Sequence, residues 1–333
     1  MTKVITNPEF GIELVLAIPY AYWLHQNNQL EYVVTSRGMK PFYYFCDDVR
    51  EEFSERTIDN AAAGLNELSN NWLHHNSVKV FGIDYSDLND EDKRKANGVL
   101  DYSQWTPPPY KEYYKNDEIG FGKPIVFISN KYNLEFNQEP FGYFDIKCLY
   151  EMFSYLTENG YAVVYKRVTN EEEDFTLDQN EVNSIRAGYH NILADVEGIG
   201  TISDRQLPEY FEDVYLFDDI VEKYSHYSYN EVQLKVMANS EGLISVCGGN
   251  SMLSAYFGNN VISYVHRGAE LRPDYYGENT YYSKLLGTNN VIPIYDVISK
   301  VNDVEVAEKW GYKVNYDNKN DYTEILNKMK EVF

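Results

Sequence analysis

One stretch late in the chain constrains its fold more than any other: an apolar run that breaks into two glycines. Residues 243–247 are mainly apolar, Gly248 and Gly249 follow, and Asn250 and Ser251 then precede a helix-like segment. This order predicts a strand, a tight turn and the start of a helix. Glycines allow the sharp turn, and the unpaired N–H groups of a first helical turn favour an anion. The stretch therefore predicts a phosphate-binding turn, although the same turn also serves packing in parallel α/β proteins.

The alternation of strands and helices runs through the second part of the chain. Apolar runs of strand length are separated by segments with helical periodicity, and each helix between two strands implies a right-handed crossover. Such a chain folds into a parallel sheet that helices cover on both faces. We expect strands at 124–129, 161–166, 214–217, 243–247 and 261–265, and helices at 146–158, 179–191, 229–239, 251–257 and 322–333.

The first part of the chain predicts a smaller α/β unit. Its segment 105–122 is rich in proline, glycine and charge, which is typical of a connector. Pro19 would kink the first helix or mark its start. The expected elements are a buried helix at 11–26, strands at 30–36, 41–45 and 78–83, and a helix at 51–68.

We therefore expect an α/β protein with two Rossmann-like domains that face each other across a cleft. The N-terminal domain would comprise residues 1–122 and the C-terminal domain residues 123–333. A chain of 333 residues is long enough for two domains. The last helix is one that could pack back on the N-terminal domain.

Charge and composition exclude some classes of protein. A net charge of −23 without a stripe of Lys and Arg argues against a nucleic-acid-binding protein. Cys46, Cys148 and Cys247 are far apart, which disfavours a disulfide framework or a zinc site. The sequence shows no secretory signal pattern and no apolar run of about 18 residues, so we expect a cytoplasmic protein without a transmembrane segment.

Polar residues follow three of the expected strands, at the edge where open parallel sheets bind ligands. Asn130 and Lys131 follow the first strand, Lys166 and Arg167 end the second, and the two glycines end the fourth. Together they form a cationic, glycine-lined mouth that suits an anionic diphosphate, and Asn130 can hydrogen-bond a ring. Taken singly, Lys166 and Arg167 could equally be an exposed strand end. Glu270, which follows the fifth strand, could bind ribose hydroxyls.

Several short segments carry a resemblance to a known family. They are 9–14, 19–22, 129–132, 135–137, 229–239, 242–251 and 257–258. The last three resemble the donor-binding half of glycosyltransferases with two Rossmann-like domains, the GT-B fold. Their layout is similar to that of heptosyltransferase- and fucosyltransferase-type enzymes. The first four are similar to segments of glycosyltransferases from large algal viruses and some microbes.

The resemblance implies that the C-terminal domain binds a nucleotide-sugar, that the N-terminal domain binds the acceptor, and that the reaction occurs in the cleft. The backbone amides of Gly248, Gly249, Asn250 and Ser251, residues 248–251, would hold the diphosphate. Lys131, Lys166 and Arg167 would neutralise it. Glu270 would bind the ribose or the donor sugar.

The resemblance also implies that a carboxylate of the N-terminal domain is the catalytic base, within hydrogen-bond reach of the acceptor hydroxyl. Glu13 is the first candidate, Glu9 the second and Asp47 the third. Glu13 follows a glycine at the start of an apolar helix, where burial would favour the protonated carboxyl and give it a defined direction. Glu13 could equally be a helix-start carboxylate that interacts with the helix dipole. Asp47 and Asp48 are adjacent and do not form a metal site, so we expect no required metal.

These inferences predict an inverting, metal-independent glycosyltransferase. It would move a sugar, such as a pentose or deoxyhexose, from a nucleotide-sugar to a glycan acceptor. We expect no cofactor beyond this donor, with a UDP-sugar preferred to a GDP-sugar. The alternatives are a nucleotide-sugar epimerase or a pyruvyl-type transferase on the same architecture, and a non-catalytic carbohydrate-binding protein. The sequence specifies neither the acceptor nor the oligomeric state.

Overall fold

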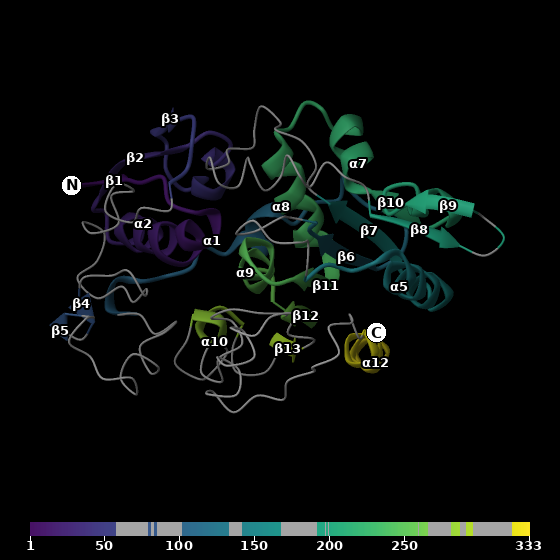
Figure 1. Ribbon diagram of the computed structural model, residues 1–333. Coiled ribbons are helices and arrows are strands. Elements are labelled where there is room, and N and C mark those ends of the chain that lie inside the picture. The colour runs from purple at the N-terminus through teal and green to yellow at the C-terminus, as the bar shows by residue number, and fades with distance from the viewer. Residues whose placement is uncertain are drawn as a thin grey trace.

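Two parallel sheets form the framework of the part of the chain that the structure describes. The computed structural model describes residues 1–57, 79–80, 83–84, 102–132, 142–167, 192–196, 198, 200–258, 260–265, 281–286, 291–295 and 322–333. Within these residues one sheet has three strands, a second has six, and two short antiparallel pairs accompany them. Figure 1 shows the three-stranded sheet beside the six-stranded sheet.

The six-stranded sheet is parallel, and its strand order is β10-β7-β6-β11-β12-β13. Counted along the chain, this is the order third, second, first, fourth, fifth, sixth, which is the strand order of the dinucleotide-binding Rossmann fold. The winding therefore reverses between β6 and β11. The strands are β6 Ile125–Asn130, β7 Ala162–Arg167, β10 Val214–Leu216, β11 Ser240–Val246, β12 Asn260–Val265 and β13 Val291–Tyr295.

Helices cover both faces of this sheet. Successive residues of a strand point to opposite sides, so the apolar strands present buried side chains on each face. Ile128 and Tyr165 belong to the core on one face, whereas their neighbours Phe127 and Val164 belong to the core on the other. The first face carries α5 (Ile146–Glu158) and α12 (Thr323–Val332), and the second carries α7 (Phe217–Lys223), α8 (Tyr229–Asn239) and α9 (Gly249–Ala255).

Two of these helices, α5 and α8, have the bounds that the sequence predicted. The carboxylate of Asp145 accepts a hydrogen bond of 2.8 Å from the backbone N–H of Cys148 at the start of α5. The hydroxyl of Ser228 accepts one of 3.3 Å from Glu231 at the start of α8. These N-caps satisfy amides that have no acceptor within the helix, so both starts are encoded locally.

The N-terminal sheet has the order β1-β2-β3 and is also parallel. The predicted buried helix follows its first strand, and the predicted strand at 30–36 is confirmed as β2. The elements are β1 Thr2–Ile5, α1 Phe10–Ile12, η1 Glu13–Ala17, α2 Ile18–Gln26, β2 Leu30–Ser36, η2 Lys40–Tyr43 and β3 Val49–Phe53. Figure 1 places α1 next to α9, so the start of the N-terminal helix meets the helix that follows the glycine turn.

A π-helical segment, η1, interrupts the first helix just before Pro19. Proline has no N–H, so neither the carbonyl four residues earlier nor the one five residues earlier receives a helical hydrogen bond from it. These are the carbonyls of Val15 and Leu14. The indole N–H of Trp105 donates to the Val15 carbonyl at 2.7 Å, and the hydroxyl of Tyr256 donates to the Leu14 carbonyl. Pro19 thus ties the helix to the connector and to the residue that follows α9.

The connector is packed rather than extended into solvent. It follows η5 (Tyr102–Gln104) and contains α4 (Tyr110–Tyr114), a helix that the sequence did not predict, and α4 packs against α8. The side-chain amide of Asn239 donates to the carbonyls of Asn116 at 2.9 Å and Ile119 at 2.7 Å. One continuous buried core runs from the N-terminal helix to α9. The domain limit at residue 122 stays a prediction.

Several expectations were wrong in detail. The segment 41–45 is not a strand, because η2 occupies 40–43 with its proline in the first turn, where a missing N–H is tolerated. The expected helix at 51–68 begins inside β3, and its part beyond residue 57 lies outside the described residues, as does the expected helix at 179–191.

Other elements differ from the expectation in their number, pairing or packing. The expected strand at 78–83 corresponds to an antiparallel pair, and the sequence did not predict β1, β13 or the pair formed by β8 and β9. The last helix packs against α5 and β12 and so against the six-stranded sheet, contrary to the expected packing on the N-terminal domain. The remaining elements are β4 Lys79–Val80, β5 Ile83–Asp84, β8 Leu193–Val196, β9 Gly200–Ser203, η6 Leu207–Tyr210 and α10 Tyr281–Leu286.

No helix among the described residues combines the length and the apolar character needed to cross a bilayer.

Candidate functional site

The carboxyl ends of β6 and β11 form the candidate site. The two strands are neighbours, and the chain leaves them in opposite directions, toward α5 on one face and α9 on the other. In open α/β sheets such a reversal leaves a crevice in which ligands bind. Lys131 follows β6 and Gly248 follows β11 closely. The Nζ atom of Lys131 lies 3.9 Å from the position that a Cβ on Gly248 would take, so the predicted cation and the glycine turn do converge.

Each glycine of the turn has its own physical reason. Gly248 has φ 116° and ψ −160°, a backbone conformation that residues with a Cβ rarely adopt. A Cβ on Gly249 would lie 2.8 Å from Cδ1 of Phe10 and 3.4 Å from the backbone nitrogen of Gly11. The N-terminal helix start therefore lies directly against the turn. Neither Phe10 nor Gly11 was recognised from the sequence as part of the site. Their contact with Gly249 joins two segments far apart in the chain, and no pattern within either segment indicates it.

Ser251 has a different role from the one predicted. Its N–H and its hydroxyl both donate to the Gly248 carbonyl, at 3.0 and 2.9 Å, and its hydroxyl also lies 3.2 Å from that of Tyr282. The amide of Ser251 is thus used to close the turn and is not aimed at a ligand. The helix starts at Gly249, two residues earlier than predicted, so Gly249 and Asn250 are the residues whose amides have no acceptor within it.

Lys166 lies beneath the turn. Its ammonium donates to the side-chain oxygen of Gln233 on α8 and, at 3.2 Å, to the side-chain oxygen of Asn250. Lys166 is only 2% exposed, and burial lowers its pKa to about 7, while the charge of Asp218 acts in the opposite direction. Lys166 therefore holds Asn250 from the protein side. Gln233 was not among the predicted site residues, because it lies 67 positions from Lys166.

Arg167 is not brought to the glycine turn. Adjacent strand residues point to opposite faces, so Arg167 lies on the side of the sheet away from Lys166. Its Nε atom is 2.5 Å from Oδ2 of Asp204, and both side chains are 0% exposed. The hydroxyl of Tyr165 donates to the same carboxylate at 2.7 Å. The expectation that Arg167 neutralises a diphosphate is therefore not supported, because its charge is already compensated inside the domain.

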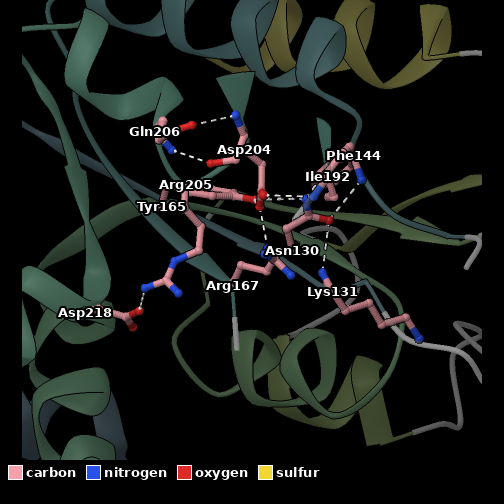
Figure 2. Close-up of polar contacts among 11 residues, drawn as sticks. Asn130, Lys131, Phe144, Tyr165, Arg167, Ile192, Asp204, Arg205, Gln206 and Asp218 are labelled. Atoms are coloured by element: carbon pink, nitrogen blue, oxygen red, sulfur yellow. Dashed lines mark hydrogen bonds and ion pairs between the residues drawn. The ribbon is translucent and has the colours of Figure 1, made fainter. Parts of the chain in front are cut away.

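Asn130 is also fully used within the protein. Its side-chain oxygen accepts from the N–H groups of Lys131 at 3.0 Å and Phe144 at 2.9 Å. Its side-chain amide donates to the Phe144 carbonyl at 2.9 Å and to the hydroxyl of Tyr165 at 3.1 Å. These four bonds exhaust the usual capacity of an asparagine, which contradicts the expected contact with a ring. Figure 2 shows this cluster, with the side chain of Lys131 extending away from it.

Glu13 is the first residue of η1 and lies at the carboxyl edge of the three-stranded sheet. Its Oε1 atom accepts from the hydroxyls of Thr35 and, at 2.9 Å, Tyr43. Its Oε2 atom lies 2.6 Å from Nη1 of Arg56. The carboxylate has a defined direction, as predicted, but these partners enclose it and leave its side chain 0% exposed. π-Helical turns are frequent at functional sites, which fits a role for Glu13 beyond packing.

The other two candidate bases lie at opposite edges of the same sheet. Glu9 is exposed and follows β1, four residues before Glu13, so it shares the carboxyl edge. Asp47 is exposed and precedes β3, so it lies at the amino edge, away from the glycine turn. Parallel strands place their carboxyl ends at one edge of the sheet. Asp47, the third candidate, therefore lies the length of β3 away from the edge that holds Glu9 and Glu13. Glu270 lies outside the described residues, and its assignment stays a prediction.

No protein-family model matches the sequence, and no curated protein matches it. Among solved structures, the chain is similar to the ADP-heptose lipopolysaccharide heptosyltransferase II of E. coli. The identity is 10%, the match covers 99% of this chain and 97% of that chain, and the TM-score is 0.50. At this identity the similarity shows the fold, and the expected resemblance to heptosyltransferases is confirmed at that level.

Two further glycosyltransferases are similar at lower scores. The family 9 glycosyl transferase of Veillonella parvula has 9% identity and a TM-score of 0.45 over 99% of this chain and 96% of that chain. The iron-containing dodecameric glycosyltransferase TibC of enterotoxigenic E. coli has 12% identity and a TM-score of 0.40 over 79% of this chain and 59% of that chain.

Proposed function

We propose that this protein is a glycosyltransferase that takes a sugar from a nucleotide-sugar and binds the donor diphosphate at the glycine turn after β11. The observation that carries the proposal is the convergence of Lys131 and Gly248 where the winding of the six-stranded sheet reverses. Open α/β sheets bind nucleotides at this place. The overall fold, which is similar to that of a heptosyltransferase, supports the same assignment.

The donor diphosphate would receive hydrogen bonds from the amides of Gly249 and Asn250 and an ionic contact from Lys131. Lys166 would act from beneath through Asn250, to which its ammonium already donates. As the glycosidic bond to the diphosphate breaks, charge grows on the leaving group, and these fixed donors stabilise it. Such a site works without a metal ion. Glu270 is proposed for the ribose or the donor sugar, with UDP preferred to GDP.

Glu13 is the proposed base of a single, inverting displacement. It would accept the proton of the acceptor hydroxyl as that oxygen attacks the anomeric carbon of the donor. Two hydroxyls, those of Thr35 and Tyr43, already donate to Oε1, so this oxygen is suited to a third hydroxyl that replaces one of them. The enclosure of Glu13 requires a local opening before the acceptor reaches it. Glu9 is the alternative, since it lies on the same edge and is exposed.

Binding of the donor is tested by thermal denaturation with UDP, GDP, CDP and their sugars. A ligand that binds only the native state raises the midpoint of unfolding. We expect an increase with one nucleotide class, a much smaller increase for Lys131→Met, and an unchanged increase for Lys147→Met, an exposed lysine on α5. The absence of any shift in the wild type would overturn the proposal.

The base is tested with Glu13→Gln and Glu9→Gln, by assaying donor turnover with and without mixed glycan acceptors. We expect Glu13→Gln to keep the nucleotide-dependent thermal shift and to lose transfer by about 10²-fold or more. Full transfer by Glu13→Gln together with loss in Glu9→Gln would move the role to Glu9. Interconversion of the donor sugar without any acceptor would indicate an epimerase instead.

The enclosure of Glu13 favours one second candidate, a carbohydrate-binding protein without catalysis. In that case Glu13 and its three donors form a structural network, and neither Glu13→Gln nor Glu9→Gln changes any measured turnover, since there is none. Binding of a glycan without binding of a nucleotide would support this alternative.

A further inference from the structure

A buried arginine, Arg56, reaches two groups at the carboxyl edge of the N-terminal sheet. Its Nη1 atom donates to Oε2 of Glu13 at 2.6 Å and to the carbonyl of Pro8 at 2.6 Å. The side chains of Arg56 and Glu13 are 3% and 0% exposed. An ion pair shielded from water in this way interacts far more strongly than one on the surface, and its geometry is well defined.

The two oxygens of Glu13 have different partners. Oε1 accepts from hydroxyls, which are neutral, whereas Oε2 accepts from the guanidinium, which stays charged in proteins. Among the contacts of Glu13 in the described chain, Arg56 supplies the positive charge. Arg56 therefore occupies Oε2 and leaves Oε1 as the oxygen that faces hydroxyl donors.

The second contact of Arg56 leads toward the glycine turn. The segment around Arg56 is bonded to the loop after β1, because Thr57 donates its N–H to the Asn7 carbonyl at 2.9 Å and the Asn7 side chain donates to the Glu55 carbonyl at 3.0 Å. This loop continues into Phe10, whose ring centre lies 5.6 Å from the guanidinium carbon of Arg56.

Phe10 is also the residue that a Cβ on Gly249 would meet, at 2.8 Å. Arg56 thus contacts the candidate base directly and, through Pro8 and Phe10, the helix start that lies against the candidate diphosphate site.

We propose that Arg56 is a positioning residue for the transfer step. It fixes the direction of the Glu13 carboxylate through Oε2, and it holds the segment from Pro8 to Gly11 against the glycine turn. It is not proposed to touch donor or acceptor. The inference rests on the proposed function, because it assigns a role in that reaction.

The experiment compares Arg56→Lys and Arg56→Gln with Arg50→Gln, whose native arginine forms an exposed pair with Asp48 in β3. Misplacement of a catalytic group by about 1 Å costs on the order of 10²-fold, so Arg56→Gln should lower kcat by about this factor, with the donor KM within about threefold of the wild type. Arg56→Lys should restore kcat to within about tenfold of the wild type, since it returns the charge. Arg50→Gln should leave kcat unchanged.

A double variant shows whether Arg56 acts through Glu13. If it does, the Arg56→Gln substitution lowers kcat when Glu13 is present. It adds little further loss when it is combined with Glu13→Gln, because the effects of residues that act as a unit are not additive. The nucleotide-dependent thermal shift confirms that each variant is folded. Multiplicative losses in the double variant, or equal losses in Arg56→Lys and Arg56→Gln, would overturn the inference while transfer by the wild type upholds the proposed function. A wild type with neither transfer nor nucleotide binding would overturn the proposed function and this inference with it.

Discussion

Replacing Lys166 by methionine should remove a pH dependence from the stability of the protein. Lys166 is 2% exposed, and burial lowers its pKa from 10.5 to about 7. In the unfolded chain the same lysine keeps its proton up to about pH 10.4. Between these two values the unfolded state binds more protons than the folded state, so the contribution of Lys166 makes stability rise with pH. Below about pH 7 the lysine is charged in both states, and the full cost of its burial is present.

The magnitude follows from the two pKa values. A depression of this size corresponds to roughly 5 kcal/mol of stability lost to the buried charge below pH 7. Most experiments reach only the lower part of the window, and between pH 7 and pH 9 we expect the Lys166 contribution to rise by about 2 kcal/mol. Lys166→Met cannot be protonated, so the variant should lack this rise, although it also leaves Gln233 and Asn250 without the ammonium that they accept from.

The assay is urea denaturation of the wild type and Lys166→Met at steps of half a pH unit from pH 6 to pH 9. The difference in unfolding free energy between the two proteins cancels the titration of all other groups to first order. Lys223→Met, at an exposed position on α7, is the control and should follow the wild type. Parallel curves for the wild type and Lys166→Met would refute the argument that burial controls this lysine.

Two further changes test how the rest of the framework is held. Tyr256→Phe leaves the buried Leu14 carbonyl without its donor and should destabilise the protein by about 1–3 kcal/mol in urea, whereas an unchanged midpoint would show that this contact is dispensable. Arg167→Met leaves the Asp204 carboxylate buried and unpaired and should cost about 3–5 kcal/mol. Arg50→Met, at a pair whose side chains are 44% and 48% exposed, should shift the urea midpoint far less than Arg167→Met does, and equal shifts would show that burial is not the cause.

The elements that the sequence predicted well are those encoded by neighbouring residues. The helices at 146–158 and 229–239 have the observed bounds, because an N-cap and an apolar periodicity lie within each segment. The glycine turn after β11 was also predicted, because a break from an apolar run into paired glycines is a local signal. The prediction of a strand at 41–45 was wrong although the deciding signal is also local, since a proline in its first positions favoured a helical turn over the apolar pattern.

In the candidate site, too, some features were predicted from the sequence and others depend on the tertiary structure. The parallel α/β pattern predicted that Lys131 and Gly248 lie at the same edge of the sheet, whereas their approach follows from the adjacency of β6 and β11, which the sequence did not predict. The separation of Lys166 from Arg167 follows from strand alternation, but which residue of the pair faces the turn depends on the pairing register of β7. A shift of one residue would have exchanged their roles.

What the sequence by itself determined is therefore the presence of the strands β6, β7, β10, β11 and β12 and of the helices α5, α8, α9 and α12, together with the glycine turn after β11. The tertiary structure decided which polar side chains are compensated inside the protein, as Arg167 is by Asp204, and that Glu13 meets Arg56 across 43 positions of the chain. The physical reason is range. Periodicity and capping act between residues a few positions apart, whereas the partner of a buried charge is chosen by strand order and register, which bring together residues with no relation along the chain.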